Sequence, residues 1–226
     1  AVYGYDSTGT QQVTTTTPWA FGVFCDDVGG SGLIGFDASD VTLTPQRLDQ
    51  SWAVTGSYLT DSLFDPFSGV GLTRIGSRLY KFNSGPGQID VLDLNTGVTS
   101  SVALSDPAYQ PELMSGSGAC QNCFNQTLAC SIGEIATNND CIISVWDIAS
   151  GALVFSDTVY VPTVAGAWGQ RLSLLCDNSN IVVGVYDNTD AVMHFFHYSI
   201  PSYTKTDLSG VYSRVTGKGW LLNKTY

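Results

Sequence analysis

Short apolar runs separated by tight polar turns dominate the hydrophobic pattern of the chain. The clearest example begins at Gln170, where QRLSLLC, IVVGVYD, AVMHFFHYS and YTKTDLS follow one another. Short strands joined by turns such as DNSN and NTD are typical of an antiparallel meander. The middle runs are apolar almost throughout, which indicates that both faces of this four-stranded sheet are buried.

The same order of four strands is predicted three times upstream. The first strands are AFGVFC, GVGLTRI and NQTLAC, and the second strands are LIGFD, RLYKFN and GEIAT. The third strands are DVTLT, IDVLDL and CIISVWDI, and the fourth strands are RLDQSWAV, VTSSVAL and ALVFSDT. The chain ends supply the remainder. AVYGYDSTGTQQVTTTT reads as a third and a fourth strand, and SGVYSRVTGKGWLLNKTY reads as a first and a second strand.

Two internal matches support this division into units. IDVLDLNTG, which begins at Ile89, aligns with ISVWDIASG, which begins at Ile143, at an offset of 54 residues. FCDDVGGSGLIGFDASD (24–40) aligns with LCDNSNIVVGVYDNTD (175–190), an offset of about three units. A β-sandwich would also explain many short strands, but it would not explain the second match.

We therefore predict an all-β fold. Residues 1–226 would form one five-bladed β-propeller of four-stranded antiparallel blades, with the N- and C-terminal strands sharing one blade. Radial blades bury both faces of each sheet against their neighbours, and the shared blade closes the ring.

The motif VLDLNTG and its counterpart VWDIASG resemble the outer hairpin of β-propeller repeats, including WD repeats and the YVTN-like repeats of surface-layer proteins. The Gly-His pair of WD repeats is missing, since the only histidines, His194 and His197, lie inside a predicted strand. The resemblance implies the fold and no particular function.

Composition narrows the range of partners. The formal net charge is −11, and only nine residues are Lys or Arg. Such a chain cannot easily assemble a basic patch, so nucleic acid and anionic membranes are poor partners. No apolar run reaches the roughly 18 residues of a membrane span.

Several features favour a secreted protein, or one on a cell or virion surface. The N-terminus, AVYG, reads as an end left by signal removal. Asn125 and Asn223 begin glycosylation sequons. The six cysteines are even in number and favour disulfides in such a compartment: Cys25, Cys120, Cys123, Cys130, Cys141 and Cys176.

The cysteine spacing leaves alternatives open. Cys120, Cys123, Cys130 and Cys141 could be read as a zinc site, but the second half lacks the short C-x-x-C spacing. We instead expect Cys141, at the start of a third strand, to pair with Cys120 or Cys123 in the preceding loop. Cys25, Cys130 and Cys176 are expected at equivalent first-strand ends near the axis. The sequence predicts no metal and no cofactor.

Catalytic patterns are weak. His194 and His197 are three apart on a strand, so they point to opposite faces and cannot bind one metal together. Asp residues recur near strand ends, and they are expected to cap turns rather than to form a calcium site or a pair of catalytic acids. They are Asp26, Asp27, Asp37, Asp40, Asp177, Asp187 and Asp190. We therefore predict that the protein is not an enzyme.

Aromatic residues in the loops between blades are the candidate binding face, and the longest loops span about 55–68 and 106–119. These residues are Trp19, Trp52, Tyr58, Phe64, Phe67, Tyr109 and Trp168. They could equally fill gaps between blades.

The favoured function is a structural or adhesive glycoprotein module that contacts other protein subunits, including copies of itself. The alternatives are a carbohydrate-binding, lectin-like propeller and a five-bladed glycoside hydrolase. Sugar sites should repeat from blade to blade, yet Trp19 and Trp168 lack counterparts in two units. The hydrolase would need an evident pair of axial acids.

Overall fold

The computed structural model describes most of the predicted strands. The described residues are 2–5, 11–15, 25–26, 33–36, 42, 44–49, 53–66, 70–83, 87–105, 120–134, 140–161, 171–187 and 192–209. Side chains within this set are described except at positions such as Cys25 and Cys120, where only the backbone is. Among these residues no helix is long and apolar enough to cross a membrane.

The described residues form four antiparallel sheets of four strands each, and strands pair in chain order within each sheet. Sheet 1 contains β3 (Cys25–Asp26), β4 (Leu33–Gly35), β5 (Gln46–Leu48) and β6 (Val54–Ser57). Sheet 2 contains β7 (Val70–Ile75), β8 (Arg78–Asn83), β9 (Gln88–Asp93) and β10 (Thr99–Ala103). Sheet 3 contains β11 (Cys120–Phe124), β12 (Leu128–Glu134), β13 (Cys141–Asp147) and β14 (Leu153–Tyr160). Sheet 4 contains β15 (Arg171–Cys176), β16 (Asn180–Asp187), β17 (Val192–Ser199) and β18 (Thr204–Asp207).

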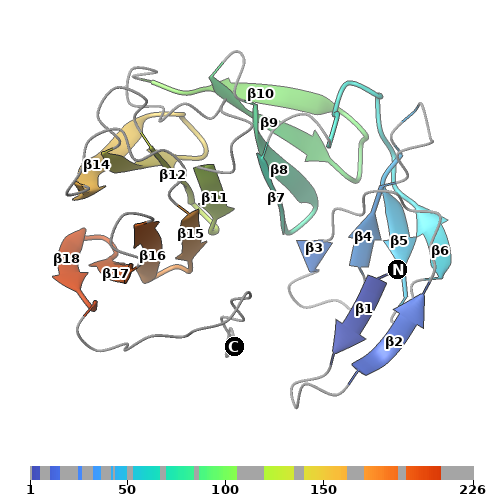
Figure 1. Ribbon diagram of the computed structural model, residues 1–226. Helices are drawn as coiled ribbons and strands as arrows, with labels where there is room; N and C mark the ends of the chain where they lie inside the picture. The colour runs from blue at the N-terminus through green and yellow to red at the C-terminus, as the bar shows by residue number, and fades with distance from the viewer. Residues whose placement is uncertain are drawn as a thin grey trace.

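The sheets follow one another around a common centre, with the first strand of each sheet innermost and the fourth outermost (Figure 1). The inner strands of neighbouring sheets contact one another: β3 lies against β7, β7 against β11, and β11 against β15. This is the radial arrangement of propeller blades.

A separate hairpin of β1 (Val2–Tyr5) and β2 (Gln11–Thr15) stands beside sheet 1 (Figure 1). The antiparallel pairing predicted for the N-terminal segment is therefore confirmed. The two C-terminal strands that would complete this blade fall at 210–226, which lies outside the described residues.

Sheets 2 and 4 match the predicted strands closely, because their runs are apolar and their turns polar. Sheet 3 requires a correction. Its first strand is β11, whereas NQTLAC forms the following turn and the beginning of β12. Sequence reasoning missed β11 because CQNCF is half polar and does not look like a buried strand.

Sheet 1 also requires a correction, since its outer strands lie later in the chain than predicted. DVTLT alternates like a strand, yet β5 begins only at Gln46. The turn to β6 is set by Asp49, whose backbone N–H donates to the Ala53 carbonyl and whose carboxylate accepts from the Ala53 N–H, both at 3.0 Å. This local capping decides where the turn lies.

Three apolar interfaces hold the sheets together. Ile34, Phe36, Phe64, Leu79 and Leu92 lie between sheets 1 and 2, in what we call the first interface. Phe82, Phe124, Ala129 and Trp146 are among those between sheets 2 and 3, the second interface. Leu128, Ile132, Ile143, Val183 and Phe196 are among those between sheets 3 and 4, the third interface. Sheets 2 and 3 thus bury both faces.

The repeated motif forms the turn between the third and fourth strands of sheets 2 and 3. The Asp93 carboxylate accepts from the N–H groups of Asn95 and Thr96 at 2.9 and 3.2 Å. Asp147 accepts from the Ser150 N–H at 2.8 Å. Gly97 and Gly151 close these turns at φ values of 73° and 70°, which favour glycine. Each of these two aspartates therefore caps the turn of its motif.

Candidate functional site

The four cysteines whose side chains are described, Cys123, Cys130, Cys141 and Cys176, are not in disulfides. The expected pairing of Cys141 with Cys123 is therefore not supported. In the β12–β13 register Cys141 lies opposite Glu134. Cys123 lies opposite Cys130 across β11 and β12, and Cys130 lies opposite Val145, several residues from Cys141 along β13. Cys25 lies in β3, the first strand of sheet 1, as expected. Cys120 begins β11 and does not lie in a loop, so that part of the prediction is wrong. The side chains of Cys25 and Cys120 lie outside the described set.

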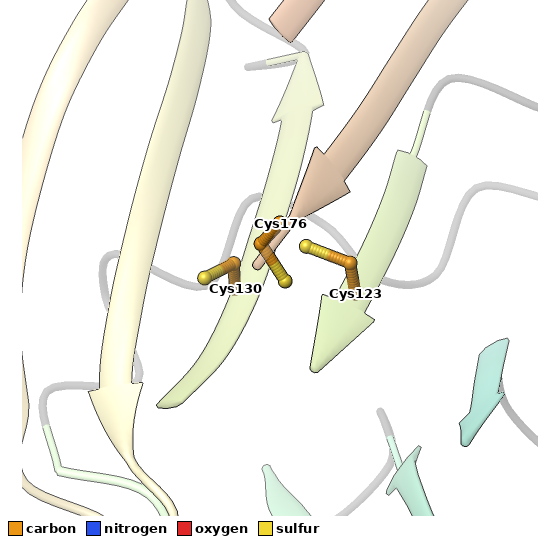
Figure 2. Close-up of side chains that lie close together, drawn as sticks. All are labelled: Cys123, Cys130 and Cys176. Carbon is orange, nitrogen blue, oxygen red and sulfur yellow. The ribbon is translucent and has the colours of Figure 1, made fainter. Parts of the chain in front are cut away.

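Three of the thiols converge. Cys123 on β11 lies opposite Cys130 on β12, and Cys176 ends β15 in the next sheet. Their three sulfur atoms all lie within 4.8 Å of one another (Figure 2). The prediction that Cys130 occupies a first-strand end is wrong, because it lies within a second strand. The prediction is right for Cys176, and the structure brings both residues to the same place.

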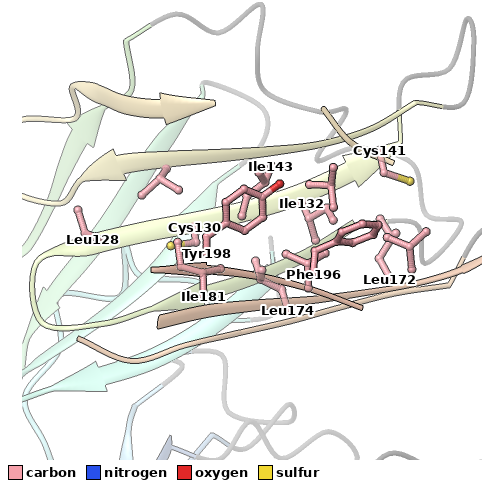
Figure 3. Packing of buried hydrophobic residues seen from close by; sticks show 14 residues of the cluster. Leu128, Cys130, Ile132, Cys141, Ile143, Leu172, Leu174, Ile181, Phe196 and Tyr198 are labelled. Atoms are coloured by element: carbon pink, nitrogen blue, oxygen red, sulfur yellow. The ribbon is translucent and has the colours of Figure 1, made fainter. Parts of the chain in front are cut away.

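The cluster is set in an apolar interface. Figure 3 shows Cys130 among the packed side chains of sheets 3 and 4, near Leu128, Ile181 and Tyr198. Cys130 is fully buried, whereas Cys123 and Cys176 are partly exposed. Burial raises the pKa of the Cys123 thiol, and its contacts with Cys130 and Cys176 raise it further. For Cys130 the hydrogen bond with Cys123 lowers the pKa, but the hydrogen bond with Cys176 and burial outweigh it and leave the pKa raised. Both shifts favour the neutral thiol over the thiolate at Cys123 and Cys130.

Asn125 serves the turn between β11 and β12. It is buried, and its side-chain oxygen accepts from the Leu128 N–H at 2.7 Å and the Thr127 N–H at 2.9 Å. Its Nδ2 donates to the Asp177 carbonyl of sheet 4 at 2.8 Å. A glycan on Nδ2 would displace this contact, so glycosylation at Asn125 stays a prediction that this fold opposes. Asn223 lies outside the described residues.

Two of the predicted binding-face aromatics have a structural role. Phe64 is fully buried in the first interface. Tyr58 packs against the same cluster, with the guanidinium of Arg47 over its ring at 4.3 Å and a hydrogen bond from Arg74 at 3.2 Å. These two residues fill the gap between sheets and are not an open binding face. Trp19, Trp52, Phe67, Tyr109 and Trp168 lie outside the described residues.

The same loop instead exposes aliphatic side chains that sequence reasoning did not select. Leu59 is 58% exposed and Leu63 74% exposed, and Val98 in the facing turn of sheet 2 is 58% exposed. The loop lies directly on this turn, because a Cβ built at Gly97 would stand 2.8 Å from the Leu59 Cβ. We call Leu59, Leu63 and Val98 the apolar loop patch.

The apolar loop patch is held in place by a carboxylate. Asp61, between the two leucines, accepts from the Thr99 N–H at 2.7 Å and from the Thr99 hydroxyl at 2.6 Å. Slight desolvation opposes the effect, but the hydrogen bonds from Thr99 and Leu63 lower the pKa of Asp61. The loop is thus fixed to sheet 2 and not free to fold the leucines inward.

A buried ion pair lies beneath this loop. Lys81 and Asp90 face each other across β8 and β9, with Nζ 3.5 Å from Oδ2, and both residues are buried. Lys81 also donates to the Asp65 carbonyl. Asp90 accepts from Asn83 and Ser101 at 2.8 and 2.9 Å. Desolvation lowers the pKa of Lys81, against the opposing attraction of Asp90 and Asp65.

The two histidines and two further aspartates, Asp177 and Asp187, have structural partners. His194 stacks on Tyr160 with ring centroids 4.4 Å apart, and His197 is 2.8 Å from the Asn180 side-chain oxygen. Asp177 caps a turn through the N–H groups of Ser179 and Asn180, as predicted. Asp187 is buried and accepts from the Tyr160 hydroxyl at 2.8 Å, and the turn that it is expected to cap lies outside the described residues.

An open groove of about 330 Å³ lies between sheets 2 and 3. Arg78 and Tyr80 of β8 line one side, and Gln126, Thr127 and Asp147 line the other. Asp147 is already engaged by Ser150, which lowers its pKa. The groove therefore offers one cation and several amide and hydroxyl groups, but its carboxylate is committed to the turn.

Comparisons with known proteins bear on the fold alone. No protein-family model matches the chain, and no curated protein is similar in sequence. Hydrazine synthase from Kuenenia stuttgartiensis is 17% identical, with a TM-score of 0.49 over 90% of this chain and 69% of that chain. The Pan2 WD40 domain of Neurospora crassa is 13% identical, with a TM-score of 0.45 over 78% of this chain and 48% of that chain.

TolB from Acinetobacter baumannii is 13% identical, with a TM-score of 0.52 over 91% of this chain and 47% of that chain. This chain thus spans about half the length of the TolB chain and of the Pan2 domain. The four radially arranged antiparallel sheets and the likeness to TolB lead to one conclusion. The chain is a β-propeller repeat protein.

Proposed function

We propose that this protein is a non-catalytic structural module that binds other protein subunits through the apolar loop patch. The observation that carries the proposal is the exposure of Leu59, Leu63 and Val98 at one site, where a loop of sheet 1 crosses a turn of sheet 2. Adjacent exposed aliphatic side chains are a typical feature of protein contact surfaces.

The construction of the patch supports a binding role. Phe64 anchors one end of the loop in the core, and Asp61 fixes the middle to Thr99. A surface held in this way loses little conformational entropy when a partner binds, which favours affinity. Leu63 is the most exposed of the large apolar side chains that are described, so it is the natural anchor.

Charge gives the proposal a second, independent readout. Copies of a chain with net charge −11 repel one another at long range. Contact between copies through an apolar patch would therefore strengthen as salt screens this repulsion, whereas a contact made by ion pairs would weaken.

Size exclusion with light scattering at 50 and 500 mM salt tests for contact between copies of the chain. Chemical crosslinking in extracts of the surface on which the protein occurs tests for contact with another protein. We expect assemblies that grow with salt, or a specific crosslinked protein, and we expect Leu59→Asp/Leu63→Asp to abolish either. Val154→Asp is the matched control, since Val154 is 44% exposed on the outer strand of sheet 3. Equal loss in the control, or binding unchanged by the double variant, would overturn the proposal.

We also propose that the ring has five blades and is closed by the chain ends. The β1–β2 hairpin supplies two antiparallel strands that have no other strands in their sheet among the described residues. Two strands from 210–226 would complete that blade. Amide hydrogen exchange tests this closure, since deleting 210–226 should remove protection from Val2–Tyr5.

Placement outside the cell or on a surface is part of the same proposal. It is supported by the scarcity of Lys and Arg and by the sequon at Asn223. Mass analysis of the native protein before and after glycosidase treatment tests it, and a glycan is expected on Asn223 rather than on the buried Asn125.

A further inference from the structure

We propose that Cys123, Cys130 and Cys176 form a binding site for a thiophilic closed-shell cation, Zn²⁺ or Cu⁺, between sheets 3 and 4. The site is independent of the apolar loop patch, which lies on sheets 1 and 2. It differs from the four-cysteine spacing considered in the sequence, because Cys176 replaces Cys120 and Cys141.

The geometry is close to that of a three-sulfur site. The sulfurs lie within 4.8 Å of one another. A metal–sulfur distance of about 2.3 Å requires sulfurs roughly 4 Å apart in a trigonal or tetrahedral arrangement. The required contraction is therefore less than about 1 Å, within reach of small side-chain rotations at the two partly exposed cysteines.

The surroundings select a soft cation. All three donors are thiols, and soft sulfur donors favour Zn²⁺ and Cu⁺ over Ca²⁺ or Mg²⁺. Cys130 faces the packed apolar interface, while Cys123 and Cys176 are partly buried residues packed against it (Figure 2). Cu⁺ would use the three sulfurs alone, whereas Zn²⁺ would add a water on the exposed side.

Binding is a proton-for-metal exchange with no change of oxidation state. Each ligating thiol loses its proton to the solvent as its sulfur bonds the cation. Because two ligands come from sheet 3 and one from sheet 4, the bound ion would join neighbouring blades at their inner strands.

The test uses the full chain, reduced and handled without oxygen, and titrated with ZnCl₂ in one arm and with Cu⁺ in the other. We expect one tightly bound ion per chain in at least one arm, release of protons, and a higher melting temperature on binding. Cys123→Ala and Cys176→Ala should each weaken binding more than about 100-fold, since loss of a second-shell partner already costs 10- to 100-fold.

Cys141→Ala is the matched control, because Cys141 is buried in the same interface but lies outside the cluster. It should retain the affinity of the unaltered chain. Circular dichroism verifies that each variant folds. If the buried Cys130→Ala variant does not fold, the variants at the partly exposed Cys123 and Cys176 still test the site.

Three results would overturn the proposal. The first is a disulfide between any two of the three residues in the freshly isolated protein, detected by alkylation and mass analysis. The second is no metal bound by the folded, reduced chain in either arm. The third is equal loss of binding in Cys141→Ala.

Discussion

The first and third interfaces each pack two neighbouring sheets together, but they bury different kinds of side chain. Sheets 1 and 2 enclose a buried ion pair of Lys81 with Asp90. The loop over this pair is fixed to sheet 2 by the hydrogen bonds between Asp61 and Thr99. Sheets 3 and 4 meet through aliphatic side chains and three thiols. Their polar contacts include the hydrogen bond from Tyr198 to Asp157 at 2.7 Å and the ion pair of Lys205 with Asp157, which lies nearer the surface. One repeated architecture therefore tolerates a charged centre in one interface and a sulfur-rich one in another.

The comparison shows where each interface is vulnerable. Removing one member of a buried ion pair leaves an uncompensated charge, which costs far more than the intact pair contributes. In an apolar interface the loss of one hydrogen bond costs only that bond and the desolvation of the group left behind.

The largest expected effect is at the ion pair. Asp90→Ala should lower the free energy of unfolding by about 3–5 kcal/mol, because Lys81 would be left buried without its carboxylate. Guanidinium unfolding measures the change. The paired replacement Lys81→Met/Asp90→Leu should recover most of the loss, and a double variant as unstable as Asp90→Ala would contradict the role assigned to charge.

A smaller effect is expected in the third interface. Tyr198→Phe removes the hydroxyl that donates to Asp157, while Lys205 stays 3.5 Å from that carboxylate. Since Asp157 is partly solvated, the loss should be about 1–2 kcal/mol in the same assay. A loss as large as that of Asp90→Ala would erase the distinction between the interfaces.

The smallest effect is a pH dependence of local stability at the Asp61–Thr99 contact of the first interface. The pKa of Asp61 is below its ordinary value of 3.8 in the fold, so the carboxylate contributes stability above that pH. The contribution begins to fade as pH falls through 3.8 and is lost as pH falls through the lower pKa of the folded state. Hydrogen exchange should show that the Thr99 amide opens more readily at pH 3 than at pH 5. In Asp61→Asn the Thr99 amide should open readily at both pH values.

The strand order was predictable where the pattern was strong. The runs beginning at Arg78 and Ile181 are apolar and end at polar turns, and they form β8 and β16 nearly as expected. Prediction failed at β11 and β5, where Cys-Gln-Asn-Cys hides a strand and Asp-Val-Thr-Leu-Thr imitates one. Pattern alone cannot separate these cases, since hydrogen-bond partners in β12 and the Asp49 turn decide them.

The candidate sites were less predictable. Tyr58 and Phe64 lie in the loop that carries the apolar loop patch, but the sequence could not show that they fill the interface and leave Leu59 and Leu63 exposed. Likewise, six cysteines in a chain with sequons favoured disulfides on compartment grounds. Which sulfur atoms lie close together depends on how sheets 3 and 4 pack, and this packing brings Cys176 next to Cys123 and Cys130.

By itself the sequence determined the repeat, the four-stranded units and the Asp-to-Gly turns, because each depends on residues close together in the chain. Only the tertiary structure decided the thiol cluster, the ion pair's burial and the apolar loop patch. These join residues of different strands or sheets, and their chemistry exists only once the blades pack against each other.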